Sequence, residues 1–283
     1  MTTVLSPPPS TVEAGAPYVL GRSAPEYERL RRQARQLEPL TARLLNRVGL
    51  IDGMRCLDVG SGPGEVMRLM AERVGDAGSV TGIDLDGALG RDALARLHAA
   101  GHRNCRFLEG DILTTPRPAG PGFDLVYARL VLIHAERPLD LLARMWEWTA
   151  PGGVLVVQDY DLDAIASDPP HAVLEEFRRV ALAVFRHAGR PVNAGSRLRR
   201  QFTAAGLGAP DGTAVEGLLE PLSVARSMIE AVYRSVLPLA LEWAVTNAAE
   251  ADELLADLAS APADITVRYP LLVGAYRRKE AVS

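Results

Sequence analysis

The sequence has few cysteines, and the two it has are isolated. Cys56 and Cys105 are the 2 cysteines among 283 residues, and each lies inside an apolar run with no second ligand at a metal-binding spacing. Isolated thiols build neither a disulfide framework nor a cysteine-based metal site. We therefore expect no metal, and a reduced, cytoplasmic protein in which both thiols pack as small core residues.

A net positive charge and long hydrophobic runs are absent as well. Lys279 is the single lysine, and the formal net charge is −4. Such a composition argues against a nucleic acid or an anionic membrane as partner. No run reaches the ~20 apolar residues of a membrane span, and the N-terminus lacks the basic and apolar regions of a secretory signal. The expected partner is a small molecule, bound by a monomer or a homodimer.

What the chain does contain is a regular alternation of short apolar runs and amphipathic segments. This alternation predicts an α/β fold with a parallel sheet that is covered by helices on both faces. The expected strands lie at 55–59, 79–84, 105–109, 125–128 and 154–159, and the expected helices between them lie at 65–74, 87–100 and 138–149.

The flanks of this alternation divide the rest of the chain. Residues 1–16 are rich in Ser, Thr and Pro and predict a disordered tail before a single domain at 17–283. Within that domain we expect N-terminal lid helices at 17–48, a cofactor-binding core at 49–160, a helical cap with a late strand at 161–260 and a C-terminal strand at 261–283. Further helices are expected at 24–48, 171–189, 195–205 and 223–248, and strands at 215–220 and 265–276, the last interrupted by Pro270.

The first expected strand ends in a glycine-rich turn. Gly60, Gly62 and Gly64 leave room for the backbone to approach a ligand closely. Asp84, about 20 residues beyond the turn, suits the two hydroxyls of a ribose. A dinucleotide fingerprint would need a glycine at position 65, where Glu65 stands and would repel a pyrophosphate. The turn therefore predicts a site for a nucleoside that has no phosphates and carries a positive centre.

These segments resemble the motifs of the class I S-adenosylmethionine-dependent methyltransferases. The likeness is carried by residues 57–64, 82–84, 109–112 and 123–129, together with the turn at 151–153. The flanking residues 18–30 and 273–276 resemble the UbiE-like subgroup, which acts on small molecules. The resemblance implies a doubly wound, seven-stranded, mostly parallel sheet of the Rossmann-like methyltransferase fold, in the order 3-2-1-4-5-7-6 with the last strand antiparallel.

The resemblance also implies contacts to S-adenosylmethionine. Asp84 would take the ribose hydroxyls, and Asp111 would receive the adenine amino group. Asp58 and Glu65 would offset the positive charge of the ammonium and sulfonium, and the carbonyl of Ala128 would hold the ammonium. The other expected cofactor contacts are Tyr18, Gly60, Ser61, Gly62, Gly64, Leu85, Gly110, Ile112 and Arg129.

Three of these contacts have a structural alternative. Asp84 is also typical of a turn at a strand end, and Asp111 is also typical of a helix N-cap. Tyr18 would equally serve as a hydrophobic anchor for the N-terminus.

The groups that would carry the chemical step are less clearly marked. His134 follows the strand-four motif and is the expected general base, with a helix-terminal or a surface histidine as the alternative. Three roles are open for Arg129, which would position the acceptor, close over the cofactor carboxylate or pair with Asp159. Asp159, Tyr160 and Asp161 lie at the end of the fifth expected strand, and we expect at least one of them to contact the acceptor.

The expected reaction is methyl transfer from S-adenosylmethionine, which yields S-adenosylhomocysteine, to an O, N or C nucleophile. The expected acceptor is a small, fairly apolar metabolite, by analogy one from specialised metabolism. One alternative is an enzyme on the same scaffold that uses bound cofactor in a cyclisation or rearrangement. A second is a non-catalytic cofactor-binding protein, and an NAD-dependent dehydrogenase is the rival on a related fold.

Overall fold

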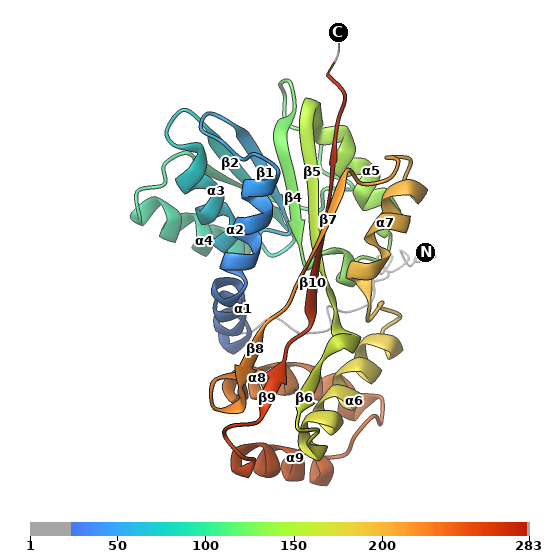
Figure 1. Cartoon of the computed structure of the whole chain (residues 1–283). Coiled ribbons are helices and arrows are strands. Elements are labelled where there is room, and N and C mark those ends of the chain that lie inside the picture. The colour runs from blue at the N-terminus through green and yellow to red at the C-terminus, as the bar shows by residue number, and fades with distance from the viewer. Residues whose placement is uncertain (1–23, 282–283) are drawn as a thin grey trace, which may run out of the picture.

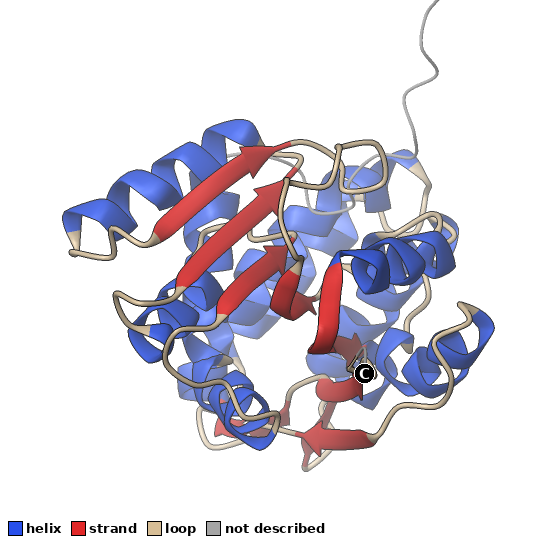
Figure 2. Cartoon of the chain, turned by 90° about the horizontal axis from the view of Figure 1, so that it is seen from above, coloured by secondary structure: helices blue, strands red, loops and turns tan. Residues whose placement is uncertain are grey.

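The central sheet has seven strands in the order that the resemblance implied. The computed structural model describes residues 24–281, and within them the order is β3-β2-β1-β4-β5-β10-β7. Neighbouring strands from β3 to β5 pair in parallel, whereas β10 is antiparallel to both β5 and β7 (Figure 2). The bounds are β1 (Arg55–Val59), β2 (Ser79–Asp84), β3 (Cys105–Glu109), β4 (Phe123–Arg129), β5 (Thr149–Asp161), β7 (Gly212–Glu216) and β10 (Leu271–Arg278).

Helices cover both faces of this sheet, because successive residues of a strand point to opposite sides. Cys56 packs in a cluster with α2 and α3, whereas its neighbour Leu57 packs in a cluster with α5 and α7. Both cysteines are buried, as expected for small core residues. The helices are α2 (Glu38–Arg47), α3 (Glu65–Val74), α4 (Gly87–Ala99), α5 (Pro138–Trp148) and α7 (Ala194–Ala204).

A second group of elements lies beyond the carboxyl ends of β4 and β5, and we call it the cap (Figure 1). It has a core of its own, in which side chains of its three helices pack together. Helix α1 (Ala24–Gln36) packs against both α8 of the cap and α3 of the sheet layer. The cap consists of α6 (Ala172–His187), α8 (Leu222–Glu242), α9 (Ala248–Ser260) and a small sheet of β6 (Ala166–Asp168), β9 (Thr266–Arg268) and β8 (Leu219–Pro221).

Two segments that we expected to be single strands are each divided between the two sheets. The segment 215–220 splits into β7 of the large sheet and β8 of the small one, with Gly217 between them. The segment 265–276 splits into β9 and β10 at Pro270, which has no N–H to donate to a ladder. The sequence showed the break at Pro270 but not the one at Gly217, and it did not show that the chain changes sheets at either.

The expected helix at 24–48 is also divided. Leu37 is the N-cap of α2, and Pro39 follows in the first turn of that helix, where a missing N–H costs nothing. The break separates α1, which reaches the cap, from α2, which stays on the sheet. At the other end of the chain, the segment expected as a helix at 223–248 ends at Glu242, and Asn247 starts α9 with a capping box.

Candidate active site

A cavity of about 1060 Å³ lies at the carboxyl ends of the parallel strands. One part of its lining comes from the glycine turn, the ends of β2 and β4 and helix α1. The other part comes from α6 and α8 of the cap. Single ligands usually occupy pockets of roughly 300–1,000 Å³. The cavity is therefore large enough for a nucleoside cofactor and a second small molecule.

The glycine turn is tightly enclosed. Gly60 has a φ of +67°, and a Cβ atom there would lie 2.6 Å from Cγ2 of Val131. Gly64 has a φ of +79°, and its Cβ atom would lie 2.9 Å from Cβ of Ala93. Neither position accepts a side chain without movement of its neighbours. Gly60 and Gly62 line the cavity, whereas Gly64 packs against α4 outside the lining.

Asp84 stands at the end of β2 with its carboxylate directed at this turn. Oδ2 accepts the N–H of Gly62 at 2.7 Å, and Oδ1 accepts the N–H of Asp86 at 2.8 Å. These two bonds fix the orientation of the carboxylate at the turn. Asp84 thus serves as a turn residue and also lines the ligand space. The turn role of Asp84 is therefore compatible with the predicted contact to a ribose.

Two buried oxygens near the turn have no hydrogen-bond partner within residues 24–281. They are Oδ2 of Asp58 and Oγ of Ser61, and both residues line the cavity. Burial raises the pKa of Asp58 to about 7, the guanidinium of Arg129 opposes this rise, and Asp84 adds to it. A buried carboxylate without a full set of partners is costly and favours a bound cation. This site fits the ammonium and sulfonium of S-adenosylmethionine.

The other expected cofactor residues fall into three groups. Leu85, Gly110, Asp111 and Ile112 line the cavity together. Ala128 is fully buried and lies outside the lining, so only its backbone is available for a contact. Tyr18 lies outside the described residues.

The side chain of Asp111 makes a hydrogen bond within a turn, and no helix directly follows it as the N-cap alternative expected. Its Oδ1 accepts the N–H of Leu113 at 2.9 Å. The side chain belongs to the cavity lining at the same time. The adenine contact remains a prediction that this placement permits.

The chain turns sharply after β4. Leu130 has a φ of +58°, a conformation that a branched residue adopts only under strain. The preceding residue, Arg129, donates from Nη1 to Oγ1 of Thr41 at 2.9 Å, and it lines the cavity. The alternative in which Arg129 pairs with Asp159 does not occur, since the carboxylate of Asp159 accepts backbone N–H groups.

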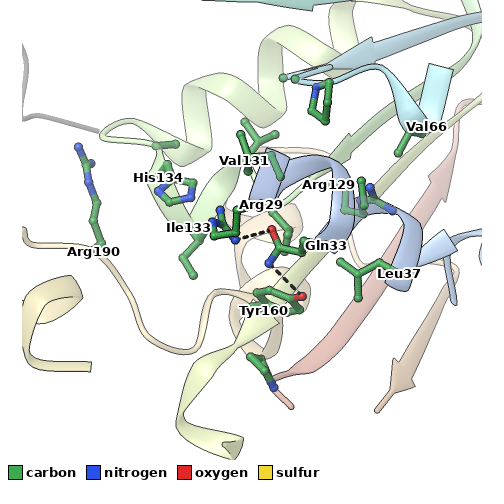
Figure 3. Close-up of a pocket in the computed structure, with 18 of the residues that line it drawn as sticks. Arg29, Gln33, Leu37, Val66, Arg129, Val131, Ile133, His134, Tyr160 and Arg190 are labelled. Atoms are coloured by element: carbon green, nitrogen blue, oxygen red, sulfur yellow. Dashed lines mark hydrogen bonds between the residues drawn. The ribbon is translucent and has the colours of Figure 1, made fainter. Parts of the chain in front are cut away.

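Asp159 and Tyr160 have different positions although they are neighbours in the chain. Asp159 is fully buried outside the cavity lining and accepts the N–H of Ile133 at 3.0 Å and that of Tyr160 at 2.9 Å. It therefore fixes the short helix η1 (Leu132–His134) instead of facing a ligand. Tyr160 does line the cavity, and Nε2 of Gln33 donates to its hydroxyl at 3.4 Å (Figure 3). Burial raises the pKa of Tyr160 to about 12, so the phenol is neutral.

His134 ends η1 and lies between Arg29 and Arg190 at the cavity wall (Figure 3). Its ring lies 5.9 Å from that of Phe185, centroid to centroid. Burial is the main cause that lowers the pKa of His134 to about 3, and the charges of Arg190 and Arg29 contribute to the same shift. The imidazole is therefore neutral at physiological pH and a weak base. His134 thus ends a short helix, as the helix-terminal alternative expects, and it lines the cavity as well.

Three charged residues near the cavity were missed from the sequence: Arg190 had no expected role, and Glu26 and Arg29 entered only within the flanking residues 18–30. Arg29 donates from Nε and Nη2 to the carboxylate of Glu26 at 2.8 and 2.7 Å, and both residues are buried. Glu26 also accepts the hydroxyl of Ser235 at 2.6 Å, which ties α1 to α8. The spacing of three residues on a helix was the signal for the pair. Nothing in the sequence placed it at the cavity.

Two kinds of feature are missing from residues 24–281. No group of three or more His, Cys, Asp or Glu side chains is arranged to hold a metal ion. Within the same range, no helix is both long and apolar enough to cross a membrane.

The sheet order, the glycine turn, Asp84 and the orphaned Asp58 together define a class I S-adenosylmethionine-dependent methyltransferase domain. Comparison with known proteins agrees, since the family model described as "Methyltransferase domain" matches residues 28–209. The chain belongs to that family.

Individual relatives match over shorter stretches. The trans-aconitate 2-methyltransferase of Delftia acidovorans is 38% identical over 118 residues, which cover 41% of this chain and 42% of that protein. Methyltransferase str3 of Strobilurus tenacellus is 33% identical over 153 residues, 54% of this chain and 52% of that one. The chain thus spans about half the length of the relatives it matches. The crystal structure of the YcgJ protein from Bacillus subtilis shares the fold, with a TM-score of 0.55 at 16% identity over 88% of this chain and 100% of that one.

Proposed function

We propose that this protein transfers the methyl group of S-adenosylmethionine to a small molecule bound at the cap end of the same cavity. The observation that carries the proposal is the continuity of the cavity. Its lining includes Asp84 and the glycine turn at one end and Phe177, Phe185 and Ile229 of the cap at the other. A donor and an acceptor bound there would share one water-poor space, and holding two reactants in line supplies much of the rate of such a displacement.

At the cofactor end, three carboxylates have separate tasks in this proposal. Asp84 accepts hydrogen bonds from the ribose, and Asp111 accepts one from the adenine. Asp58 faces the positive charge. The bound cofactor supplies an electrophilic methyl group on a sulfonium.

At the cap end, His134 and Tyr160 are two of the polar groups that line the cavity together with the apolar side chains that we assign to the acceptor. We propose that His134 hydrogen bonds to the acceptor as a neutral imidazole, because a pKa of about 3 makes it a poor proton acceptor. The acceptor atom would then be an O, N or C nucleophile that reacts without a strong base to remove a proton from it. The names of the relatives, which include trans-aconitate 2-methyltransferase, support a small-molecule acceptor. We further propose a metabolite of specialised metabolism as its source.

Two measurements test this function. The first is calorimetric titration with S-adenosylhomocysteine and, in parallel, with NAD. Binding of the first ligand alone is expected, and binding of NAD in its place would refute the proposal. The second is mass spectrometry after incubation with isotope-labelled S-adenosylmethionine and a metabolite extract.

The mass-spectrometric result separates the remaining alternatives. A labelled product that is heavier than its precursor by one CH₂ group is the expected outcome. An isomer of the precursor, formed without loss of the label from the cofactor, would assign the scaffold to a cyclisation or rearrangement. Absence of any product in the presence of tight cofactor binding would favour a cofactor-binding protein.

A further inference from the structure

Arg190 is a buried cation at the cap end of the cavity, and its charge is only weakly compensated. Its side chain is 8% exposed, and it lines the cavity beside His134 (Figure 3). Its partner among the described residues is Glu136, whose Oε1 lies 3.4 Å from Nη2, at the outer limit of a hydrogen bond. The side chain of Glu136 is 51% exposed. A guanidinium has five N–H donors, so one long bond to a solvated carboxylate leaves most of its capacity unused.

The backbone holds Arg190 in this place through the end of helix α6. Gly189 has a φ of +69°, its N–H donates to the carbonyl of Arg186, and the N–H of Arg190 donates to the carbonyl of Phe185 at 2.8 Å. This pair of bonds is the Schellman arrangement, which turns the chain back over the last helical turn. Two residues later, Val192 accepts the N–H of Leu162, so the segment is also tied to the chain that leaves β5. These hydrogen bonds fix the backbone position of Arg190, and its side chain takes no part in them.

Arg29 and Arg129, the other two arginines named at the cavity, have different surroundings. Arg29 makes two hydrogen bonds to the buried carboxylate of Glu26. Arg129 donates to Thr41, and its charge also acts on the buried Asp58. Among the described residues, the only ion pair of Arg190 is the long one to the half-exposed Glu136. A buried cation in this situation favours a ligand that brings the missing negative charge.

We propose that the methyl acceptor carries a carboxylate, and that Arg190 binds this carboxylate at the cap end of the cavity. The proposal rests on the proposed function, because it names the class of molecule that would occupy the acceptor end. A carboxylate matches the planar fork of a guanidinium with two parallel hydrogen bonds. The apolar side chains Phe177, Phe185 and Ile229 would cover the rest of the molecule. Our expectation of a fairly apolar acceptor is thereby refined to an apolar body with one acidic group.

The test compares pairs of small molecules that differ only in charge. We would use cinnamate, phenylacetate and octanoate with their carboxamides, each titrated by ligand-observed NMR into the full chain saturated with S-adenosylhomocysteine. At least one acid is expected to bind ten-fold or more tightly than its amide, since hydrogen bonds to a charged group contribute roughly ten-fold to a hundred-fold in affinity. Equal binding of acid and amide, or no binding by either series, would overturn the proposal.

Substitutions then assign the preference to one side chain. R190Q should abolish the preference for the acid, and R190K should keep part of it. E136Q should strengthen acid binding, because it removes the carboxylate that competes for Arg190. Opposite effects of R190Q and E136Q cannot come from a general loss of structure. The matched control is R197Q on the exposed face of α7, which should change nothing. An unchanged preference in R190Q would overturn the proposal.

Failure of this proposal can be told apart from failure of the proposed function. If the wild-type chain does not bind S-adenosylhomocysteine, the methyltransferase assignment itself falls. If the chain binds that ligand and methylates only acceptors without an acidic group, the proposed function stands and the role of Arg190 is refuted. Each R190 variant should retain wild-type affinity for S-adenosylhomocysteine, which shows that the cofactor end is intact.

Discussion

The affinity for cofactor should depend on pH through Asp58. The pKa of this buried carboxyl is raised to about 7, chiefly by burial. Below this pH the side chain is protonated and neutral, and above it the side chain is a carboxylate that attracts a cation. A bound ammonium or sulfonium therefore favours the ionised form, and the affinity should rise as the pH increases through 7.

The size of the effect follows from the ionised fraction. With a pKa of about 7, roughly three quarters of the Asp58 side chains are ionised at pH 7.5 and about 3% at pH 5.5. If only the ionised form binds well, the affinity for S-adenosylmethionine should fall about 25-fold over this range. The assay is calorimetric titration at several pH values at constant ionic strength. The ammonium of the ligand stays largely protonated below its own pKa, near 8, so the slope reports on the protein.

Two variants identify the titrating group. D58N should bind weakly at pH 7.5 and should show no further loss at pH 5.5. Asp159 also has a pKa raised to about 7, but it lies outside the cavity lining, so D159N should keep the wild-type slope. An affinity that is flat between pH 5.5 and 7.5 would refute the reasoning, and so would a D58N variant with the wild-type slope.

Two further predictions concern the assigned side chains. D84A should weaken S-adenosylhomocysteine binding ten-fold or more in calorimetry, because it removes the acceptor assigned to the ribose and the bond to Gly62, and wild-type affinity would contradict the motif assignment. H134Q, which retains hydrogen-bonding groups, should keep more turnover than H134A while both bind S-adenosylhomocysteine normally. The wild-type rate should show no ionisation near pH 6.5 that these variants abolish, and such an ionisation would restore His134 as a general base.

The cofactor end of the site could be predicted because its residues are close together in the sequence. The glycine turn follows β1 directly, and Asp84 ends the next strand, so local spacing was enough to bring them together. The parallel sheet then sets the remaining contacts, since its strands all end at one edge. Even the orphaned oxygen of Asp58 follows from this logic, because the residue lies inside a buried strand one position before the strand ends.

The acceptor end could not be predicted in the same way. Arg190 follows a helix end, and a sequence such as Gly189-Arg190-Pro191 indicates only that the helix stops there. Its approach to His134 depends on how the cap sits on the sheet, which involves contacts between residues far apart in the chain. The same dependence explains why β8 was not separated from β7, nor β9 from β10, in the expected strands at 215–220 and 265–276. Their apolar pattern fits either sheet, and only the tertiary arrangement decides between them.

Asp58 and Asp159 show that a raised pKa alone does not identify a ligand-binding carboxylate. Burial raises both values to about 7, yet the two groups differ in their partners. Oδ2 of Asp58 has none within residues 24–281, whereas both oxygens of Asp159 accept backbone N–H groups. D159N would turn an NH₂ group toward one of those donors and leave it unsatisfied.

We therefore expect D159N to affect stability and the position of η1 while leaving the cofactor end intact. The free energy of unfolding should fall by about 1–3 kcal/mol, the usual cost of an unsatisfied buried group. Turnover should fall as well, because Ile133 and His134 lose their fixed position. Urea unfolding and calorimetric titration with S-adenosylhomocysteine measure the two effects separately. A loss of cofactor affinity without a loss of stability would place Asp159 in the ligand site, against the geometry that separates it from Asp58.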